Sequence, residues 1–375
     1  MQLIIGGDLV PTQSNINFFS EGDAISLLGE ELYLLWNSAD MRIFNLEVPL
    51  TDKVDPIAKC GPNLIAPTNT AKGIKALNPT LITLANNHIL DHGEQGLKST
   101  KQILSDNEIP FVGIGSNISE ASEPYILERA GKKIGVYACA EHEFTIATTH
   151  SAGVNPFDPF ESLDHIQKLK SKCDYVIVLY HGGKEHYRYP SPYLQKACRK
   201  MVEKGADLVV CQHSHCIGCV EEYHGSTIVY GQGNFLFDHS ESEYWKTSLL
   251  LQLNITDRIK VEYIPIVKVD NTIRLASNKQ GEEILNGLNH RSEEIQEDGF
   301  IQNRYDLFSK QMFEGYLLGL HGGNLVFRIL NKICRRKLTR ILYSHKSLRW
   351  VRNIIECEAH RELLLNSLSR GEKIG

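Results

Sequence analysis

The chain has 375 residues, of which 42% are hydrophobic and 23% are charged, and its formal net charge is −5. This length exceeds that of one typical domain, although a single α/β domain can reach about 250 residues. The small negative charge gives no whole-chain basis for nucleic-acid binding. We therefore expect no nucleic-acid partner, and any basic surface must be local.

The N-terminal sequence and the cysteines indicate the expected compartment. The stretch MQLIIGGDLVPT has no positively charged region before its apolar run, which predicts a first strand rather than a secretory signal. No run reaches the roughly 18 uninterrupted apolar residues that suggest a membrane span. The nine cysteines are scattered and odd in number, which favours reduced thiols over a disulfide framework. These features predict a cytoplasmic protein.

Short apolar runs alternate with helical patterns through the first 270 residues. The runs predict strands at 2–5, 41–44, 81–84, 109–114, 133–139, 174–179, 208–210 and 227–230, with paired strands over 247–268. Apolar spacing of three to four residues predicts helices at 27–36, 70–77, 95–104, 160–169 and 192–204. This alternation indicates a layered α/β domain over residues 1–270.

Polar side chains that can bind a metal follow several of these strands. They are Asp8, Glu47, Asn87, His88, His181, His213 and His215. Open α/β sheets bind ligands at the carboxyl ends of their strands. Mixed nitrogen and oxygen ligands suit Zn, Mn or Fe. Each residue alone has another explanation, such as a helix cap, a turn or a hydrogen-bonded buried histidine, but their repeated position after strands favours one shared metal site.

The same residue types indicate a reaction. Two ions that share Glu47 would neutralise the charge on a phosphoryl or carboxyl centre. His88 is suited to protonate a leaving group, and Asp91, three residues further on, is suited to orient His88.

A pair of cysteines, Cys216 and Cys219, follows the two histidines in a Cys-x-x-Cys arrangement. Such a pair can form half of a zinc site or a redox pair. The sequence contains no second pair of this kind, so we favour small buried hydrophobic residues and leave the alternative open.

The composition changes after about residue 270. Residues 271–303 are polar and are predicted to form a linker, and residues 304–375 are predicted to form a basic helical extension. From Phe327 to Arg352 the chain has no acidic residue and nine lysines and arginines. Its apolar positions make 325–352 an amphipathic segment, which can lie on anionic membranes or dock on a partner. The alternative is a solvated helical appendage that packs on the domain.

The order of the motifs resembles the CapA family, the poly-γ-glutamate capsule biosynthesis proteins of the calcineurin-like metallophosphoesterase superfamily. The motifs are GGD, NLE, NNHILDHGEQGL, YHGGKEH, and GADLVVCQHSH with VYGQGNFLFD, and KCGPNLIAP is similar to the family's KxGP loop. The resemblance extends from about residue 3 to residue 240. It implies an α/β fold in the form of a four-layer α/β/β/α sandwich with a metal site at the strand ends.

The resemblance also implies roles for individual residues. It places one or two divalent ions, Mn, Zn or Fe, on Asp8, Glu47, Asn87, His181, His213 and His215. It assigns catalytic roles to His88, Asp91 and Glu185. Two departures weaken a conventional two-metal site. Asp8 is followed by Leu9 and Val10 where the superfamily has Asp-x-His, and Glu47 stands where the superfamily usually has aspartate.

The resemblance implies a metal-dependent hydrolase or transferase that acts on a phosphoester or an amide in cell-surface or capsule polymer metabolism. Its substrate would be an anionic polymer or a phosphoester, and capsule-assembly proteins would be its partners. The alternative is a catalytically degenerate scaffold in such an assembly complex. The missing first-motif histidine favours the scaffold, and the intact Asn-His and His-x-His motifs count against it. Segment 325–352 is compatible with peripheral contact at the inner membrane face in either case.

Overall fold

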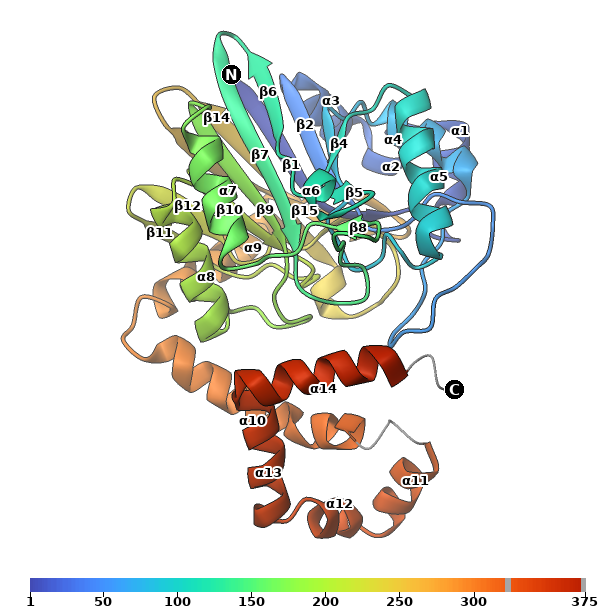
Figure 1. The fold of residues 1–375 in the computed structure, drawn as a ribbon. Helices are drawn as coiled ribbons and strands as arrows, with labels where there is room; N and C mark the ends of the chain where they lie inside the picture. The colour runs from blue at the N-terminus through green and yellow to red at the C-terminus, as the bar shows by residue number, and fades with distance from the viewer. Residues whose placement is uncertain (321–324, 372–375) are drawn as a thin grey trace. The chain divides into compact units, whose positions relative to one another are not determined.

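The chain divides into two compact units, Met1–Ile301 and Gln302–Gly375. The computed structural model describes residues 1–320 and 325–371 (Figure 1). No helix in these ranges is long and apolar enough to cross a membrane. The first unit contains both large sheets, and the second is helical.

The first sheet is organised around a buried central strand, β1 (Gln2–Val10). The strands on one side run parallel to β1 and to each other; they are β2 (Met41–Leu46), β3 (Leu81–Thr83) and β4 (Phe111–Val112). The other side is antiparallel and contains β14 (Thr247–Ile255), β15 (Ile259–Val269) and β16 (Thr272–Leu275). A short strand, β13 (Asn234–Phe237), pairs in parallel with the end of β1.

The second sheet contains six strands, and its central ones are also parallel. Its order is β11 (Val220–Tyr223), β12 (Ser226–Val229), β10 (Leu208–Gln212), β9 (Tyr175–His181), β7 (Lys132–Ala140) and β6 (Tyr125–Arg129). A small separate sheet pairs β5 (Ile114–Gly115) with β8 (Gly153–Val154).

Helices cover the outer faces of the two sheets (Figure 1). Alternate residues of a strand point to opposite faces, and β9 shows the result. Ile177 and Leu179 pack in the same core cluster as β1, whereas Val176 and Val178 pack with the helices on the outer face. These helices are α7 (Glu161–Lys170) and α8 (Pro192–Glu203). The first sheet is covered by α1 (Ile16–Glu21), α2 (Ala24–Leu28), α3 (Glu30–Ser38), α4 (Ala71–Ala76) and α5 (Gly93–Asp106), and α6 (Ile118–Ala121) lies beside β5. The four-layer α/β/β/α sandwich is therefore confirmed.

The parallel strands bring the polar motifs to one edge of the sandwich. The strand β1 is irregular between Ile5 and Asp8, where its pairing with β2 shifts register. Gly7 lies in this stretch, and a Cβ atom there would be 2.0 Å from the carbonyl oxygen of Gly233. Only glycine permits the backbone before β13 to approach so closely. This contact holds Asp8 at the edge where the other motifs end.

The polar linker expected over 271–303 is wrong. The structure has β16 in this stretch, followed by a helix, α9 (Asn278–Glu294), that begins with a capping box on Ser277. The helix packs against β15 and β11 and buries Leu288. Its other faces are polar because they face solvent, and this polarity obscured the helical pattern.

Two strand predictions also differ from the structure. The first strand continues from Ile5 to Val10, and the strand expected over 109–114 divides at Gly113, which has a φ of 94°. The hairpin partner β6 was not predicted, because its exposed residues dilute the apolar signal.

The second unit consists of helices, as the extension was expected to. They are α10 (Phe300–Leu320), α11 (Leu325–Ile333), α12 (Lys337–Leu342), α13 (His345–Glu356) and α14 (Glu358–Gly371). The helix α10 begins within the last residues of the first unit.

Candidate metal centre

His181, the last residue of β9, lies among the other predicted ligands. Its Nε2 atom is 3.3 Å from Oε1 of Glu47, 3.0 Å from Oδ1 of Asn87 and 3.1 Å from Nδ1 of His213. On its other side, Nδ1 is 3.7 Å from Oδ1 of Asp8. Residues from both sheets therefore meet at one point.

The ligand atoms form two groups that share Glu47. One group contains Glu47, His181 and His213, and the other contains Asp8, Glu47 and His215. Within each group the candidate ligand atoms lie within 4.8 Å of one another, and all these residues are buried. This arrangement can hold one ion in either group, or two ions with Glu47 between them.

The backbone after β10 adopts an unusual conformation that turns both histidines toward the site. His213 has a φ of 77° and His215 has a φ of 53°. These values lie in the left-handed region, which residues other than glycine rarely adopt. Such strain persists only where the surroundings enforce it, and it is concentrated at functional sites.

Two asparagines position the ligands, and sequence reasoning missed both. Asn45 donates from Nδ2 to Oδ1 of Asp8 at 2.7 Å, and Oδ1 of Asn234 lies 2.8 Å from Nδ1 of His215. The backbone N–H of His213 donates to the other oxygen of Asp8 at 3.2 Å. Asn45 lies in the NLE motif, two residues before Glu47, and Asn234 lies in the GQGNF motif. Their place in these motifs is the sequence signal that could have identified them.

Glu47 is a buried carboxylate that lacks compensation. Neither of its oxygens accepts a hydrogen bond from a described residue, although His181 lies within ion-pair distance. Burial, followed by the neighbouring charge of Asp8, raises the pKa of Glu47 from 4.5 to about 8. An uncompensated buried carboxylate costs several kcal/mol, and a cation removes that cost. The residues present therefore fit a divalent metal.

Two of the ligand histidines, His181 and His213, are in the form that binds metals. Burial lowers the pKa of His181 and, more strongly, that of His213. Both imidazoles are therefore neutral near pH 7, and a neutral imidazole has a lone pair available to an ion.

His88 belongs to a separate buried group beside the ligands. Its Nδ1 atom is 2.6 Å from Oδ2 of Asp91, and Asp91 also forms an ion pair with Lys59. The side chain of Lys59 is only 2% exposed, and its Nζ atom is 3.3 Å from Nδ1 of His88. The backbone N–H of Leu64 donates to Asp91 at 2.6 Å. Lys59 lies in the KCGPNLIAP loop, and the sequence motif alone does not indicate a role for this lysine.

Four predicted residues are outside the two ligand groups, but Asn87 lies next to them. Asn87 is half-buried, and its Oδ1 atom is 3.0 Å from Nε2 of His181. Glu185 is exposed on the loop after β9 and belongs to neither group. Cys216 and Cys219 are buried free thiols whose pKa values are raised by burial. Neither cysteine belongs to a ligand group in the described ranges, which agrees with small hydrophobic core residues.

The sandwich, with carboxylates and imidazoles at its strand ends, has the arrangement expected of the calcineurin-like metallophosphoesterase superfamily. The family model described as "Bacterial capsule synthesis protein PGA_cap" matches residues 2–239. The chain belongs to this family.

Two capsule biosynthesis proteins and one solved structure are similar to parts of this chain. The PGA biosynthesis protein CapA of Bacillus subtilis is 31% identical over 207 residues, with 52% of this chain and 53% of that protein covered. The capsule biosynthesis protein CapA of Bacillus anthracis is 30% identical over 201 residues, with 52% and 49% covered. The chain thus spans about half the length of these relatives. A phosphatase structure from Mycoplasma pneumoniae aligns with a TM-score of 0.44 and 15% identity, with 72% of this chain and 94% of that chain covered.

The charge of Glu47 predicts how the metal-free protein responds to pH. Between pH 4.5 and about 8 the folded state holds a proton on Glu47 that the unfolded state releases, so this residue's contribution to stability falls as the pH rises. Glu47→Gln cannot titrate. The stability of wild type relative to Glu47→Gln should therefore fall by up to about 1.4 kcal/mol per pH unit in this window.

Urea unfolding of both chelator-treated proteins at several pH values measures this difference. Adding Mn²⁺ at pH 8 should restore the stability of wild type and leave Glu47→Gln nearly unchanged. A stability difference that does not change with pH would contradict the buried, uncompensated carboxylate.

Proposed function

We propose that the chain is a metal-dependent hydrolase or transferase that acts on a phosphoester or amide of an anionic cell-surface polymer. The observation that supports this most strongly is the buried Glu47 carboxylate, which lacks hydrogen bonds and is shared by two groups of ligands. A structural core would not retain such a group, because an apolar side chain would be more stable there.

Asp8, Glu47, His181, His213 and His215 would hold one or two ions of Mn, Zn or Fe, with Asn87 as a further oxygen ligand. When bound, ions in such a site act as Lewis acids on a phosphoryl or carbonyl oxygen and activate water. The protein fixes the donors in advance: Asn45 orients Asp8, and Asn234 orients His215.

His88 would donate a proton to the leaving group. Its Nδ1 atom is engaged by Asp91, which leaves Nε2 as the nitrogen that faces away from the carboxylate. The side chain is 11% exposed and so can be reached by a substrate, whereas Asp91 is fully buried. Lys59 and the N–H of Leu64 hold Asp91 in place, so Asp91 and Lys59 are positioning residues. Glu185, exposed on a neighbouring loop, would meet substrate rather than an ion.

A non-catalytic scaffold is the second candidate, and one observation favours it. Val10 occupies the position where the first motif of the superfamily supplies a histidine, and its side chain is buried in the core. Under this alternative the same site binds a polymer or a capsule-assembly protein without turnover. The intact His88–Asp91 pair favours the enzyme, because a binding scaffold has no need of an oriented proton donor.

His88→Ala distinguishes the two candidates. Loss of a general acid costs about 10²–10⁴-fold in rate, so turnover of a phosphoester or γ-glutamyl amide should fall by that factor. The metal content should stay at the wild-type level, because His88 belongs to neither ligand group. The exposed His142 provides the control, and His142→Ala should retain wild-type turnover. Unchanged turnover in His88→Ala would refute its role as the general acid.

We also propose that the second unit contacts an anionic membrane surface. In α11, Leu325, Ile329 and Ile333 are 67%, 50% and 70% exposed, and the same helix carries Arg328 and Lys332. Exposed apolar side chains can insert into the apolar interior of a membrane, and the basic side chains of the same helix can bind its anionic head groups.

The variant Leu325→Ser/Ile329→Ser/Ile333→Ser tests this contact. It should reduce co-sedimentation with phosphatidylglycerol vesicles about tenfold or more, because it removes most of the apolar surface of α11. Leu34→Ser is the matched control, since Leu34 is equally exposed in the first unit. Equal binding of the triple variant, or equal binding of wild type to neutral phosphatidylcholine vesicles, would argue against the proposal.

A further inference from the structure

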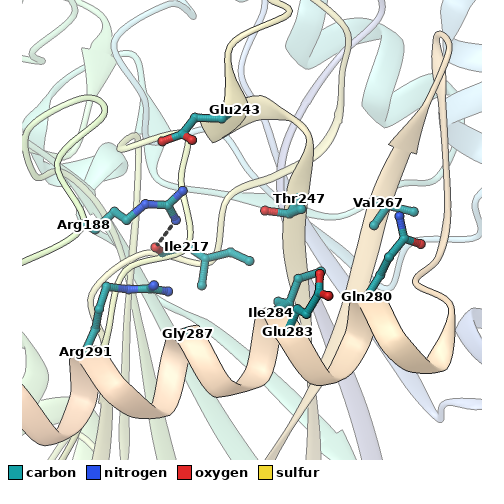
Figure 2. Close-up of a pocket in the computed structure, with 10 residues that line it drawn as sticks. All are labelled: Arg188, Ile217, Glu243, Thr247, Val267, Gln280, Glu283, Ile284, Gly287 and Arg291. Carbon is teal, nitrogen blue, oxygen red and sulfur yellow. Dashed lines mark hydrogen bonds between the residues drawn. The ribbon is translucent and has the colours of Figure 1, made fainter.

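A cavity of about 520 Å³ lies beside α9 and is separate from the ligand groups (Figure 2). Its walls come from the loop after β9, the loop after β10, the strands β14 and β15, and the short helix η2 (Glu243–Trp245). Both positive and negative side chains line it, and this distribution of charge indicates what it can bind.

Two arginines, Arg188 and Arg291, lie at one end of the cavity (Figure 2). Arg188 donates from Nη1 to the carbonyl of Ile217 at 2.9 Å, and Arg291 donates from Nε to the carbonyl of Gly218 at 2.7 Å. The guanidinium of Arg188 also lies over the ring of Tyr244, 4.8 Å from its centroid. These contacts fix both groups while leaving further N–H donors free for a ligand, because a guanidinium has five.

The two guanidinium groups are not compensated by the protein. No carboxylate of the described residues lies within 4.0 Å of either one. Burial lowers the pKa of Arg291, and the charge of Arg188 lowers it further. Arginine nevertheless stays protonated in proteins. The two positive guanidinium groups therefore repel each other, and together they attract an anion. A carboxylate matches the planar donor geometry of guanidinium groups.

Negative charge lies elsewhere on the same cavity wall. Glu243 projects from η2, and Glu283 lies two helical turns before Arg291, about 12 Å along α9. Gly287 lies between Glu283 and Arg291 on this face, and a Cβ atom there would be 3.2 Å from Nη1 of Arg291. The glycine therefore leaves the floor of the cavity open between Glu283 and Arg291.

We propose that this cavity binds an amino-acid head group, with the carboxylate at Arg188 and Arg291 and the ammonium facing Glu243. An internal stretch of a polyanion fits less well, because its repeated carboxylates would lie against Glu243 and Glu283. A free amino acid and the amino end of a γ-linked glutamate chain share this head group. The assignment to a chain end rests on the proposed function, but binding of the head group does not.

The cavity and the metal centre share structural elements. Arg188 follows His186 by two residues, and His186 accepts a hydrogen bond from Nε1 of Trp245 at 2.9 Å. The ring of Trp245 packs against that of His215, with 4.6 Å between centroids. Glu243 belongs to the same short helix as Trp245. A chain held by its end in the cavity would therefore be anchored on the segments that carry the candidate ligands.

Isothermal titration calorimetry of the full-length chain with γ-glutamylglutamate and its N-acetyl derivative tests the proposal. Wild type should bind the dipeptide at least tenfold more tightly than the N-acetyl derivative, which lacks the ammonium. Arg291→Gln should weaken dipeptide binding by tenfold or more. Glu243→Gln, at an exposed position that leaves the fold intact, should reduce the difference between the two ligands. Lys279→Gln removes one positive charge from α9 outside the cavity and should bind as wild type does.

Two comparisons separate this site from the catalytic proposal and identify the source of the head group. Turnover of His88→Ala tests the catalytic proposal, whereas dipeptide affinity of Arg291→Gln tests the cavity, so either proposal can fail without the other. Free glutamate that binds as tightly as the dipeptide identifies a free amino acid, and tighter binding of the dipeptide identifies a chain end. Absence of dipeptide binding, equal binding of the N-acetyl derivative, or equal binding by Arg291→Gln would overturn the proposal.

Discussion

The edge of the sandwich is organised around the buried carboxylate of Glu47. Burying a carboxylate without hydrogen bonds inside a protein costs free energy. Something in its surroundings must therefore neutralise the negative charge. Asp8 adds negative charge beside it, and His181 and His213 are neutral near pH 7 because burial lowers their pKa values. Without a cation, Glu47 is neutralised by a proton, which its raised pKa of about 8 keeps bound at neutral pH. An added cation takes the place of that proton. The close approach at Gly7 and the strained backbone at His213 both serve to keep the donors converged.

Much of this edge could be predicted from the sequence, because parallel strands deliver their carboxyl ends to the same place. Asp8, Glu47 and the three histidines each follow an apolar run, and the structure brings them together. Asn45, Asn234 and Lys59 were missed because their roles depend on neighbours distant in the chain. Polarity obscured α9 for a related reason: one helix face packs against β15 and β11, and the remaining faces meet solvent.

The helix α9 connects the fold with function beyond the metal centre. Its Arg291 lines the cavity beside α9, next to loops that also position His186 and Trp245. A metal centre alone selects for a reactive phosphoryl or carbonyl group and says little about the rest of a substrate. A pair of fixed guanidinium groups, together with the carboxylate of Glu243, would add selection for one end of a chain. Recognition and chemistry would then be carried by adjacent segments of one unit.

The most direct test of the central claim is the metal content of the purified full-length chain, measured by elemental analysis for wild type and for His181→Ala/His215→Ala. This double variant removes one imidazole from each ligand group and leaves the carboxylates in place. The account predicts one or two equivalents of Mn, Zn or Fe in wild type, and a loss of most of this metal in a double variant that remains folded. Wild type that takes up no metal even from excess ion, or a double variant that retains the full amount, would contradict the account.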